Sequence, residues 1–268
     1  MDLSEQLAEL ERGLRALGSV LVAFSGGADS AFLLAAAVRA LGADHVMAAT
    51  AVSPSLAQQE LPAARAFAES LGVRHLTPGT DELDNGSYVA NGADRCFHCK
   101  ATLLDTLRPL ADQHGLKHVA TGTNADDLVA GFRPGIKAAA ERQAVTPLMH
   151  LTKQQIREAS RQWGLTTSDK PALACLASRL AYGTPVTPER LARVDRAEQA
   201  LRELLDPRDV RVRDLGEDRA RVELDPTALA RWTDAAASVV QGEGFASVST
   251  REFESGSMNE LLQITPAR

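Results

Sequence analysis

One segment near the N-terminus constrains the fold more than any other. Residues 20–24 form an apolar run that predicts a buried strand, and Ser25-Gly26-Gly27-Ala28-Asp29-Ser30 follows it directly. Residues 30–41 then predict a helix. A strand, a glycine turn and a helix N-terminus together form an anion site, because glycines let backbone amides approach a phosphate and the helix end carries partial positive charge. The alternative is an ordinary glycine turn.

Strand and helix patterns alternate through the first two thirds of the chain. Strands are predicted at 20–24, 46–52, 74–77 and 118–121, and helices at 3–17, 30–41, 57–71 and 94–114. This alternation predicts an α/β fold in which right-handed crossovers build a parallel sheet with helices on both faces. Ligands of such sheets bind at the carboxyl ends of the strands, and Ser25 lies at one of them.

The later part of the chain predicts a second domain. Residues 124–150 predict loops, and Thr152 with Gln155 predicts a capping box for a helix that ends near Trp163. Residues 166–188 show little periodicity and predict an ordered loop at a domain boundary. A helix to about 205, strands at 210–213 and 221–224, a helix at 227–240 and a strand at 245–249 follow. We therefore expect domains at 1–186 and 187–268, the second a small α+β unit.

Composition excludes several classes of protein. The formal net charge is −6, which argues against broad nonspecific nucleic-acid binding and leaves a local basic patch open. No apolar stretch reaches membrane-spanning length, and the first residues are not a signal peptide, so we expect a cytoplasmic protein. The chain has 3 cysteines, an odd number that argues against a disulfide framework.

A second polar segment follows the predicted strand at 118–121. It reads Gly122-Thr123-Asn124-Ala125-Asp126-Asp127. Because parallel strands end at the same edge of a sheet, we expect this segment beside the first loop. Asn124 and the two aspartates suit a helix cap or the placement of Mg²⁺ and ATP. A simple turn is the alternative.

The cysteines fall in two places. Cys96 and Cys99 lie three residues apart on a predicted helix and therefore share one face. That spacing is compatible with a zinc site, a redox pair, an iron–sulfur cluster or two buried thiols. Cys175 lies in an irregular segment with Lys170 and Arg179, and nearby cations favour a thiolate. It is a candidate nucleophile, sulfur donor or metal ligand, or else a structural cysteine.

Four segments in one order resemble the LarE family, which comprises PP-loop sulfurtransferases of nickel-pincer nucleotide cofactor synthesis. The resemblance covers nearly the whole chain. The segments are Ser25–Ser30, Asp94-Arg95-Cys96-Phe97-His98-Cys99-Lys100, Gly122–Asp127 with Arg133-Pro134-Gly135, and Cys175-Leu176-Ala177-Ser178-Arg179-Leu180-Ala181-Tyr182-Gly183.

The resemblance implies a reaction and the residues that serve it. ATP adenylylates a carboxylate of pyridinium-3,5-biscarboxylic acid mononucleotide, pyrophosphate leaves, and sulfur replaces the activated oxygen. It implies that ATP is bound by Ser25, Gly26, Gly27, Asp29, Ser30, Gly122, Thr123, Asn124 and Asp127. Asp29 is expected to hold Mg²⁺. Arg179, Arg211 and Arg213 are expected to bind the substrate phosphate, and the family suggests a homo-oligomer.

The source of sulfur has two alternatives within the family. In one, Cys96, Cys99 and Cys175 hold a 4Fe–4S cluster that carries the sulfur. In the other, Cys175 gives up its own sulfur and becomes dehydroalanine. All three cysteines match the first pattern, which we favour. Rival functions are a PP-loop tRNA thiolase, an amide-forming synthetase and a nucleotide-binding module that senses redox state.

Overall fold

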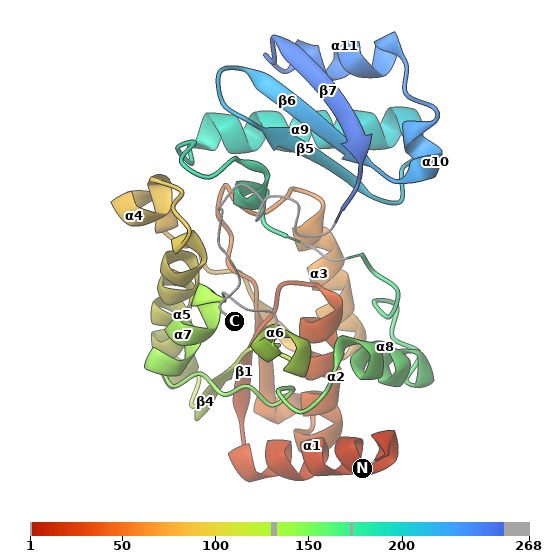
Figure 1. Ribbon diagram of the computed structural model, residues 1–268. Helices are drawn as coiled ribbons and strands as arrows, with labels where there is room; N and C mark the ends of the chain where they lie inside the picture. The colour runs from red at the N-terminus through yellow and green to blue at the C-terminus, as the bar shows by residue number, and fades with distance from the viewer. Residues whose placement is uncertain (1, 130–132, 172–173, 255–268) are drawn as a thin grey trace. The chain divides into compact units, whose positions relative to one another are not determined.

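The computed structural model describes residues 2–129, 133–171 and 174–254 (Figure 1). These residues form two compact units. As far as the ranges are described, the first unit comprises Met1–Ser53, Gln59–Glu82 and Cys96–Leu173, and the second comprises Pro54–Gln58, Leu83–Arg95 and Ala174–Arg268. The division into domains at 1–186 and 187–268 stays a prediction.

A parallel sheet forms the centre of the first unit. Its strands are β1 (Val20–Ala23), β2 (Val46–Ala49), β3 (Arg74–Leu76) and β4 (His118–Ala120), in the order β3-β2-β1-β4. All neighbouring pairs are parallel, and β1 lies between β2 and β4. The predicted α/β class with a parallel sheet is confirmed. Because β1 is central, its carboxyl end is flanked by strand ends on both sides.

Helices cover both faces of this sheet (Figure 1). Val20 and Val22 face one side, where they pack with α1 (Leu3–Leu17), α2 (Ala28–Leu41), α3 (Glu60–Ser70) and α8 (Lys153–Gln162). Leu21 faces the other side, where it packs with α5 (Arg95–Gln113) and α7 (Pro134–Glu141). This alternation follows from the period of two of a strand. Burial on both faces explains why the strands read as continuous apolar runs.

The predicted capping box at Thr152 is confirmed. The Gln155 N–H donates to Thr152 Oγ1 at 3.2 Å, and the Thr152 N–H donates to Gln155 Oε1 at 2.9 Å. Asp2 and Glu5 form the same motif at the start of α1. Two otherwise unpaired backbone donors are satisfied in each case, which fixes where the helix begins.

The prediction of loops at 124–150 was wrong in part. This segment holds α6 (Ala125–Val129) and α7, which begins with Pro134 at its first position. Pro134-Gly135 suggested a turn, but proline is also favoured at the first residue of a helix because no intrahelical partner exists there for an N–H. Helix α2 begins at Ala28, so Asp29 lies within its first turn.

The second unit contains a three-stranded sheet in the order β5-β6-β7. Strands β5 (Val210–Asp214) and β6 (Arg219–Leu224) are antiparallel, and β7 (Ser247–Glu252) is parallel to β6. Helix α9 (Pro188–Leu205) packs on β5, and α11 (Asp234–Gly242) packs on α9 and β7. The unit also holds α4 (Gly86–Val89) and a short 3-10 helix, η3 (Leu176–Arg179).

The single helix predicted at 227–240 is wrong, since the segment forms two helices. The first is α10 (Pro226–Leu229), capped by Asp225, and the second is α11, capped by Thr233. The Thr233 side chain accepts a hydrogen bond from the Ala236 N–H, so the chain restarts a helix there. Strand β7 begins at 247, two residues after its predicted start.

Candidate functional site

The glycine turn after β1 leaves the N-terminus of α2 uncapped by side chains in the described chain. Ser25 and Ser30 instead hold the turn itself. Ser30 Oγ donates to the Gly27 carbonyl at 3.1 Å and accepts from the Ser25 N–H at 3.3 Å, and the two hydroxyl oxygens lie 3.1 Å apart. The first amides of a helix lack intrahelical partners and carry partial positive charge, so this end suits a phosphate.

Two glycines allow close packing around the turn. Gly26 has a φ of +74°, in the left-handed region that favours glycine. Gly122 follows β4 and lies against the first turn of α2. A Cβ at position 122 would be 3.1 Å from the Ser30 nitrogen and 3.2 Å from the Asp29 carbonyl carbon. The two polar segments therefore lie side by side, as the topology predicts.

Asn124 connects these two segments. Its Nδ2 donates to Asp29 Oδ2 at 3.2 Å, and its Oδ1 accepts from the Asp127 N–H at 3.1 Å. The Asp127 carboxylate accepts in turn from the Asn124 N–H at 3.3 Å. Asp126 has a different partner, the N–H of Lys153 at 2.8 Å. The Thr123 hydroxyl lies 3.2 Å from that of Thr121.

The surroundings of Asp29 favour a bound cation. Burial raises the pKa of Asp29, and the negative charge of Asp127 raises it further; Lys153 and Arg157 oppose the shift. Carboxylate oxygens are ligands that Mg²⁺ prefers, and Mg²⁺ at nucleotide sites takes its other ligands from phosphates and water. Among the described residues, no three His, Cys, Asp or Glu side chains gather into a metal site. Asp29 and Asp127 therefore fit Mg²⁺ only in the presence of a nucleotide.

Three cations of this site were not predicted from the sequence. Lys153 and Arg157, on α8, act on the charge of Asp29. Lys170 Nζ donates to the Gly26 carbonyl at 3.0 Å and pairs with Glu60 at 3.0 Å. The sequence suggested Lys170 as a neighbour of the Cys175 thiol, but its ammonium is engaged on the glycine turn. Lys170 and Gly26 are 144 residues apart, and no local pattern connects them.

The first turn of α5 carries the paired cysteines. Cys96 is exposed and Cys99 is half-buried. Lys100 follows, and burial lowers its pKa, while the negative charges of Cys99 and Asp127 oppose that shift. Gly135 of α7 lies against this turn, since a Cβ there would be 3.5 Å from the Cys96 carbonyl oxygen. Lys100 is thus a further cation beside the Asp127 carboxylate that sequence reasoning did not single out.

Cys175 belongs to the second unit, directly before η3. Its carbonyl oxygen accepts from the Ser178 N–H at 2.9 Å, the Ser178 hydroxyl at 2.7 Å and Arg179 Nη1 at 3.1 Å. These bonds fix the backbone, and the side chain is exposed. Ala172 and Leu173, which belong to the same predicted motif, lie outside the described residues.

Arg179 is paired within the second unit. Its Nε and Nη2 donate to the two carboxylate oxygens of Glu198 at 2.9 and 3.1 Å, and both side chains are buried. Burial acts to raise the pKa of Glu198, but the charge of Arg179 overrides it and the net shift is downward. The guanidinium expected to bind a phosphate thus already holds a carboxylate in a two-point pair.

Arg211 and Arg213 lie on one face of β5, and both are buried rather than on an exposed face. Arg213 donates to Glu223 Oε2 from Nε at 2.9 Å and pairs with it from Nη2 at 2.7 Å. Burial lowers the pKa of Arg211 to about 10, and the positive charges of Arg179 and Arg213 contribute. Arg213 thus already holds a carboxylate, and Arg211 lies near two other guanidiniums.

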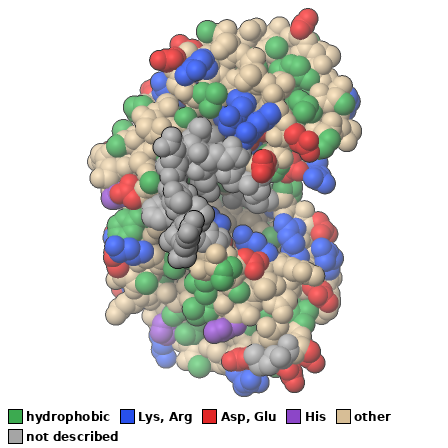
Figure 2. Space-filling view, in the orientation of Figure 1, with side chains coloured by type: hydrophobic (Ala, Val, Ile, Leu, Met, Phe, Trp, Pro, Cys, Tyr) green, Lys and Arg blue, Asp and Glu red, His purple; other side chains and the backbone are tan. Residues whose placement is uncertain are grey.

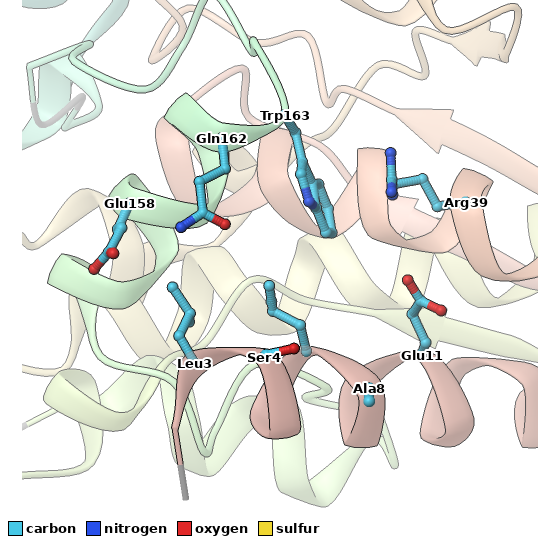
Figure 3. Close-up of a pocket in the computed structure, with 9 residues that line it drawn as sticks. Leu3, Ser4, Ala8, Glu11, Arg39, Glu158, Gln162 and Trp163 are labelled. Carbon is cyan, nitrogen blue, oxygen red and sulfur yellow. The ribbon is translucent and has the colours of Figure 1, made fainter.

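A cavity of about 350 Å³ lies on the first unit and contains none of the predicted site residues (Figure 3). Trp163 points into it, with its ring stacked on Phe32 and beneath the Arg39 guanidinium. The lining residues come from α1, α2 and the end of α8: Leu3, Ser4, Leu7, Ala8, Glu11, Arg39, Glu158, Gln162 and Trp163.

Comparisons with known proteins show similarities along nearly the whole chain. A family model described as asparagine synthase matches residues 7–216. The chain is 40% identical to the uncharacterized protein slr1717 of Synechocystis sp., over 97% of this chain and 99% of that protein. It is 33% identical to pyridinium-3,5-bisthiocarboxylic acid mononucleotide synthase of Lactiplantibacillus plantarum, over 97% of this chain and 96% of that protein.

A third similarity covers only part of the chain. The NH(3)-dependent NAD(+) synthetase of Chlorobaculum tepidum is 30% identical over 167 residues, which are 59% of this chain and 58% of that protein.

No helix in the described ranges is both long and apolar enough to cross a membrane.

Proposed function

This chain belongs to the LarE-like family of PP-loop ATP pyrophosphatases, and we propose that it uses ATP to replace carboxylate oxygen by sulfur on pyridinium-3,5-biscarboxylic acid mononucleotide. ATP use is implied by the family. The observation that carries the proposal is the uncapped start of α2 beside Asp29 and Asn124, at the carboxyl edge of a parallel sheet. The match to a pyridinium bisthiocarboxylate synthase along 97% of the chain supports the substrate class.

The first step activates the carboxylate. A carboxylate oxygen of the substrate attacks the α-phosphorus of ATP. The bond between the α-phosphorus and the oxygen that bridges it to the β-phosphorus breaks, and this oxygen leaves with pyrophosphate. The amides of the glycine turn stabilise the departing pyrophosphate, since helix N-termini favour negative charge. Lys170 holds the Gly26 carbonyl, which fixes the turn in place. Mg²⁺ at Asp29 and Asp127 would supply charge neutralisation on the phosphates.

The second step replaces oxygen by sulfur. A sulfur nucleophile attacks the acyl carbon, and AMP leaves with the former carboxylate oxygen. We propose that Cys96, Cys99 and Cys175 ligate a 4Fe–4S cluster, which would supply that sulfur as a sulfide. Cys96 and Cys99, three residues apart on the first turn of α5, support this proposal because clusters of this type are held by cysteine thiolates.

The alternative sulfur donor is Cys175 itself. Its thiolate would attack the acyl adenylate and form a thioester with release of AMP. Loss of the Cα proton then breaks the Cβ–S bond, which leaves the thiocarboxylate and dehydroalanine. The exposed position of Cys175 on a fixed backbone is compatible with this route.

Three measurements separate these routes and test the function. Pyrophosphate exchange into ATP that depends on the pyridinium dicarboxylate is expected, and its absence would contradict the proposed function. Anaerobically prepared protein is expected to contain iron and acid-labile sulfide, both lost in Cys96→Ala. Cluster-free protein that is active and becomes lighter by one hydrogen sulfide after turnover would establish Cys175 as the donor.

An amide-forming synthetase is the second candidate, favoured by the partial similarity to NAD(+) synthetase. That reaction needs an activated carboxylate but no thiol. A triple variant, Cys96→Ser with Cys99→Ser and Cys175→Ser, is therefore decisive. It should lose sulfur transfer and keep pyrophosphate exchange; full retention of the net reaction would favour the synthetase.

A further inference from the structure

A largely buried ion pair in the first unit lies against the glycine turn. Glu60, the first residue of α3, pairs at 3.0 Å with Lys170, in the segment after α8. Lys170 Nζ also donates to the Gly26 carbonyl at 3.0 Å. Helix α3 reaches the same glycine, since a Cβ at position 26 would lie 3.4 Å from Ala64 Cβ and 3.8 Å from Lys170 Nζ. The turn is therefore held between α3 and the ammonium group of Lys170.

This ion pair differs from the pairs at the molecular surface. Figure 2 shows acidic and basic side chains spread over the visible face, and exposed pairs contribute little because water screens them. The side chains of Lys170 and Glu60 are only 22% and 12% exposed. An ammonium group with so little access to water needs an opposite charge and hydrogen-bond acceptors. Glu60 supplies the charge, and the Gly26 carbonyl supplies a further acceptor.

The backbone of Lys170 is fixed independently of its side chain. Arg157 of α8 donates from Nη1 to the Ser168 carbonyl and from Nη2 to the Lys170 carbonyl, both at 2.8 Å. The Lys170 N–H donates to the Thr167 carbonyl at 3.2 Å. The side chain of Lys170 is therefore anchored at both ends, at its backbone by α8 and at its ammonium group by α3. A side chain restrained in this way has little rotamer freedom left to lose when it orients a neighbouring group.

The carbonyl that Lys170 holds determines where the next amide points. Among the described residues no peptide bond is cis, and a planar trans peptide points its N–H away from its C=O. The Gly27 N–H therefore points away from Lys170. It donates to Ser25 Oγ at 3.4 Å, a long hydrogen bond that an anion can replace. The Gly27 amide is thus available to a phosphate in this orientation.

The opposite orientation of this peptide is sterically accessible. Glycine populates positive and negative φ about equally, and the peptide lies between two glycines, Gly26 with a φ of +74° and Gly27 with a φ of −78°. A flip would exchange the directions of the C=O and N–H groups and turn a carbonyl oxygen toward the phosphate. Repulsion between that oxygen and a phosphate would oppose binding. An ammonium group on the carbonyl opposes the flip.

We propose that Glu60 and Lys170 are a positioning pair, which holds the Gly26–Gly27 peptide in the orientation that points its N–H toward the pyrophosphate part of ATP. The inference rests on the proposed function, in which the amides of this turn stabilise the departing pyrophosphate. Lys170 acts on the carbonyl, and Glu60 acts through Lys170. Neither side chain needs to contact the nucleotide.

Calorimetric titration with ATP and with AMP, both in the presence of Mg²⁺, tests the positioning pair. AMP shares the nucleoside and the α-phosphate but lacks the pyrophosphate part. Glu60→Met removes the carboxylate and keeps an unbranched side chain, and it should weaken ATP binding about tenfold and leave AMP binding unchanged. Lys170→Met should do the same. The double variant should bind ATP no more weakly than Lys170→Met, because Glu60 acts through Lys170.

The matched control is Glu69→Met, an exposed change on the same helix, which should bind both nucleotides as wild type does. Glu60→Gln carries the test further if Lys170→Met does not fold. The neutral amide keeps an acceptor for the Lys170 ammonium, so the ATP affinity of Glu60→Gln should lie between those of wild type and Glu60→Met. Any other order would overturn the inference.

The outcomes also separate the positioning pair from direct contact with phosphate and from the proposed function. If Lys170 contacted the phosphates, loss of Glu60 would release it, and Glu60→Met would bind ATP as tightly as wild type or more tightly. Either result would overturn the inference, as would equal weakening of ATP and AMP. Wild-type protein that does not bind ATP would contradict the proposed function itself.

Discussion

The Asp29 carboxylate is expected to support activity and to lower the stability of the fold, and a single substitution separates these two effects. We predict that Asp29→Asn lowers pyrophosphate exchange by roughly a hundredfold or more, because metal-linked charge stabilisation is worth several kcal/mol. The same variant should be at least as thermostable as wild type at pH 7. Burial raises the pKa of Asp29, so its ionised form is less favourable in the folded than in the unfolded chain.

The sign of this effect fixes its pH dependence. The free-energy cost of holding an ionised Asp29 in the folded chain is absent below the ordinary aspartate pKa near 4. It is complete above the raised pKa of Asp29 in the folded chain. The melting temperature of Asp29→Asn relative to wild type should therefore rise as pH increases from about 4 to 7. Asp126→Asn is the control, because the Asp126 carboxylate accepts from the Lys153 N–H, and this variant should keep exchange activity. An Asp29→Asn protein with full exchange would remove Asp29 from the site.

Sequence reasoning located those residues of the site that lie next to a glycine turn or a strand end. Asp29 and Asn124 follow strands β1 and β4, whose ends must meet at one edge of a parallel sheet, and a hydrogen bond joins them. Lys170 could not be placed in this way. Its contact with Gly26 depends on the path of an irregular segment, which no period or propensity determines.

At the level of elements, the chain after β4 can lie close to α2 because Gly122 has no side chain. We predict that Gly122→Ala lowers exchange by about tenfold, because its Cβ would lie 3.1 Å from the Ser30 nitrogen and shift the first turn of α2. Gly13→Ala is the control. A Cβ at 13 meets no atom within 4 Å, so alanine there should stabilise α1 by about 0.5–1 kcal/mol and leave exchange unchanged. Equal activity of both variants would refute the prediction.

Helix α9 is joined to β5 and η3 by one buried carboxylate. Glu198 pairs with Arg179 and accepts from the Val212 N–H at 3.1 Å. We predict that Glu198→Gln destabilises the second unit by about 3 kcal/mol or more, because it leaves Arg179 buried without an opposite charge. Urea unfolding followed by Trp232 fluorescence, with Trp163→Phe in every protein, reports this change.

The pH dependence provides an independent check on Glu198. Its pKa is lowered in the folded chain, so its stabilising effect is present above the ordinary glutamate pKa and is lost as pH falls through the lowered value. The difference between Glu198→Gln and wild type should thus shrink in acid. Glu203→Gln, an exposed change on the same helix, should unfold as wild type does. If Glu198→Gln also unfolds as wild type does, the Arg179–Glu198 pair contributes nothing to stability.

Helices were predictable from the sequence where a single pattern determined them. Leucines at positions 3, 7, 10, 14 and 17 recur at helical spacing and indicate α1, and the capping box indicates α8, because each pattern has one good structural solution. The break between α10 and α11 could not be read from apolar spacing. It is set by Thr233, whose hydroxyl caps a new helix, and a threonine is equally compatible with the interior of a continuing helix.

At the scale of the whole molecule, the parallel sheet was predictable, whereas the inclusion of residues 54–58 and 83–95 in the second unit was not. Repeated strand–helix alternation has few topological solutions. In the second unit, by contrast, single backbone hydrogen bonds join segments that are distant in the sequence. The Leu176 N–H donates to the Ser55 carbonyl at 2.9 Å, and the Val186 N–H donates to the Val89 carbonyl at 2.9 Å. Such bonds involve no side chain, so the sequence carries no sign of them.

Overall charge leads to a prediction that separates this chain from a tRNA thiolase. The formal net charge is −6, and the arginines of the second sheet share their face with a buried glutamate. RNA binding strengthens with the number of phosphates that lysine and arginine neutralise, and its affinity then falls steeply with salt. We predict no saturable binding of unmodified tRNA in filter-binding assays at physiological salt. Tight binding that weakens steeply as salt is raised would instead support an RNA substrate, and pyrophosphate exchange would then depend on tRNA in place of the pyridinium dicarboxylate.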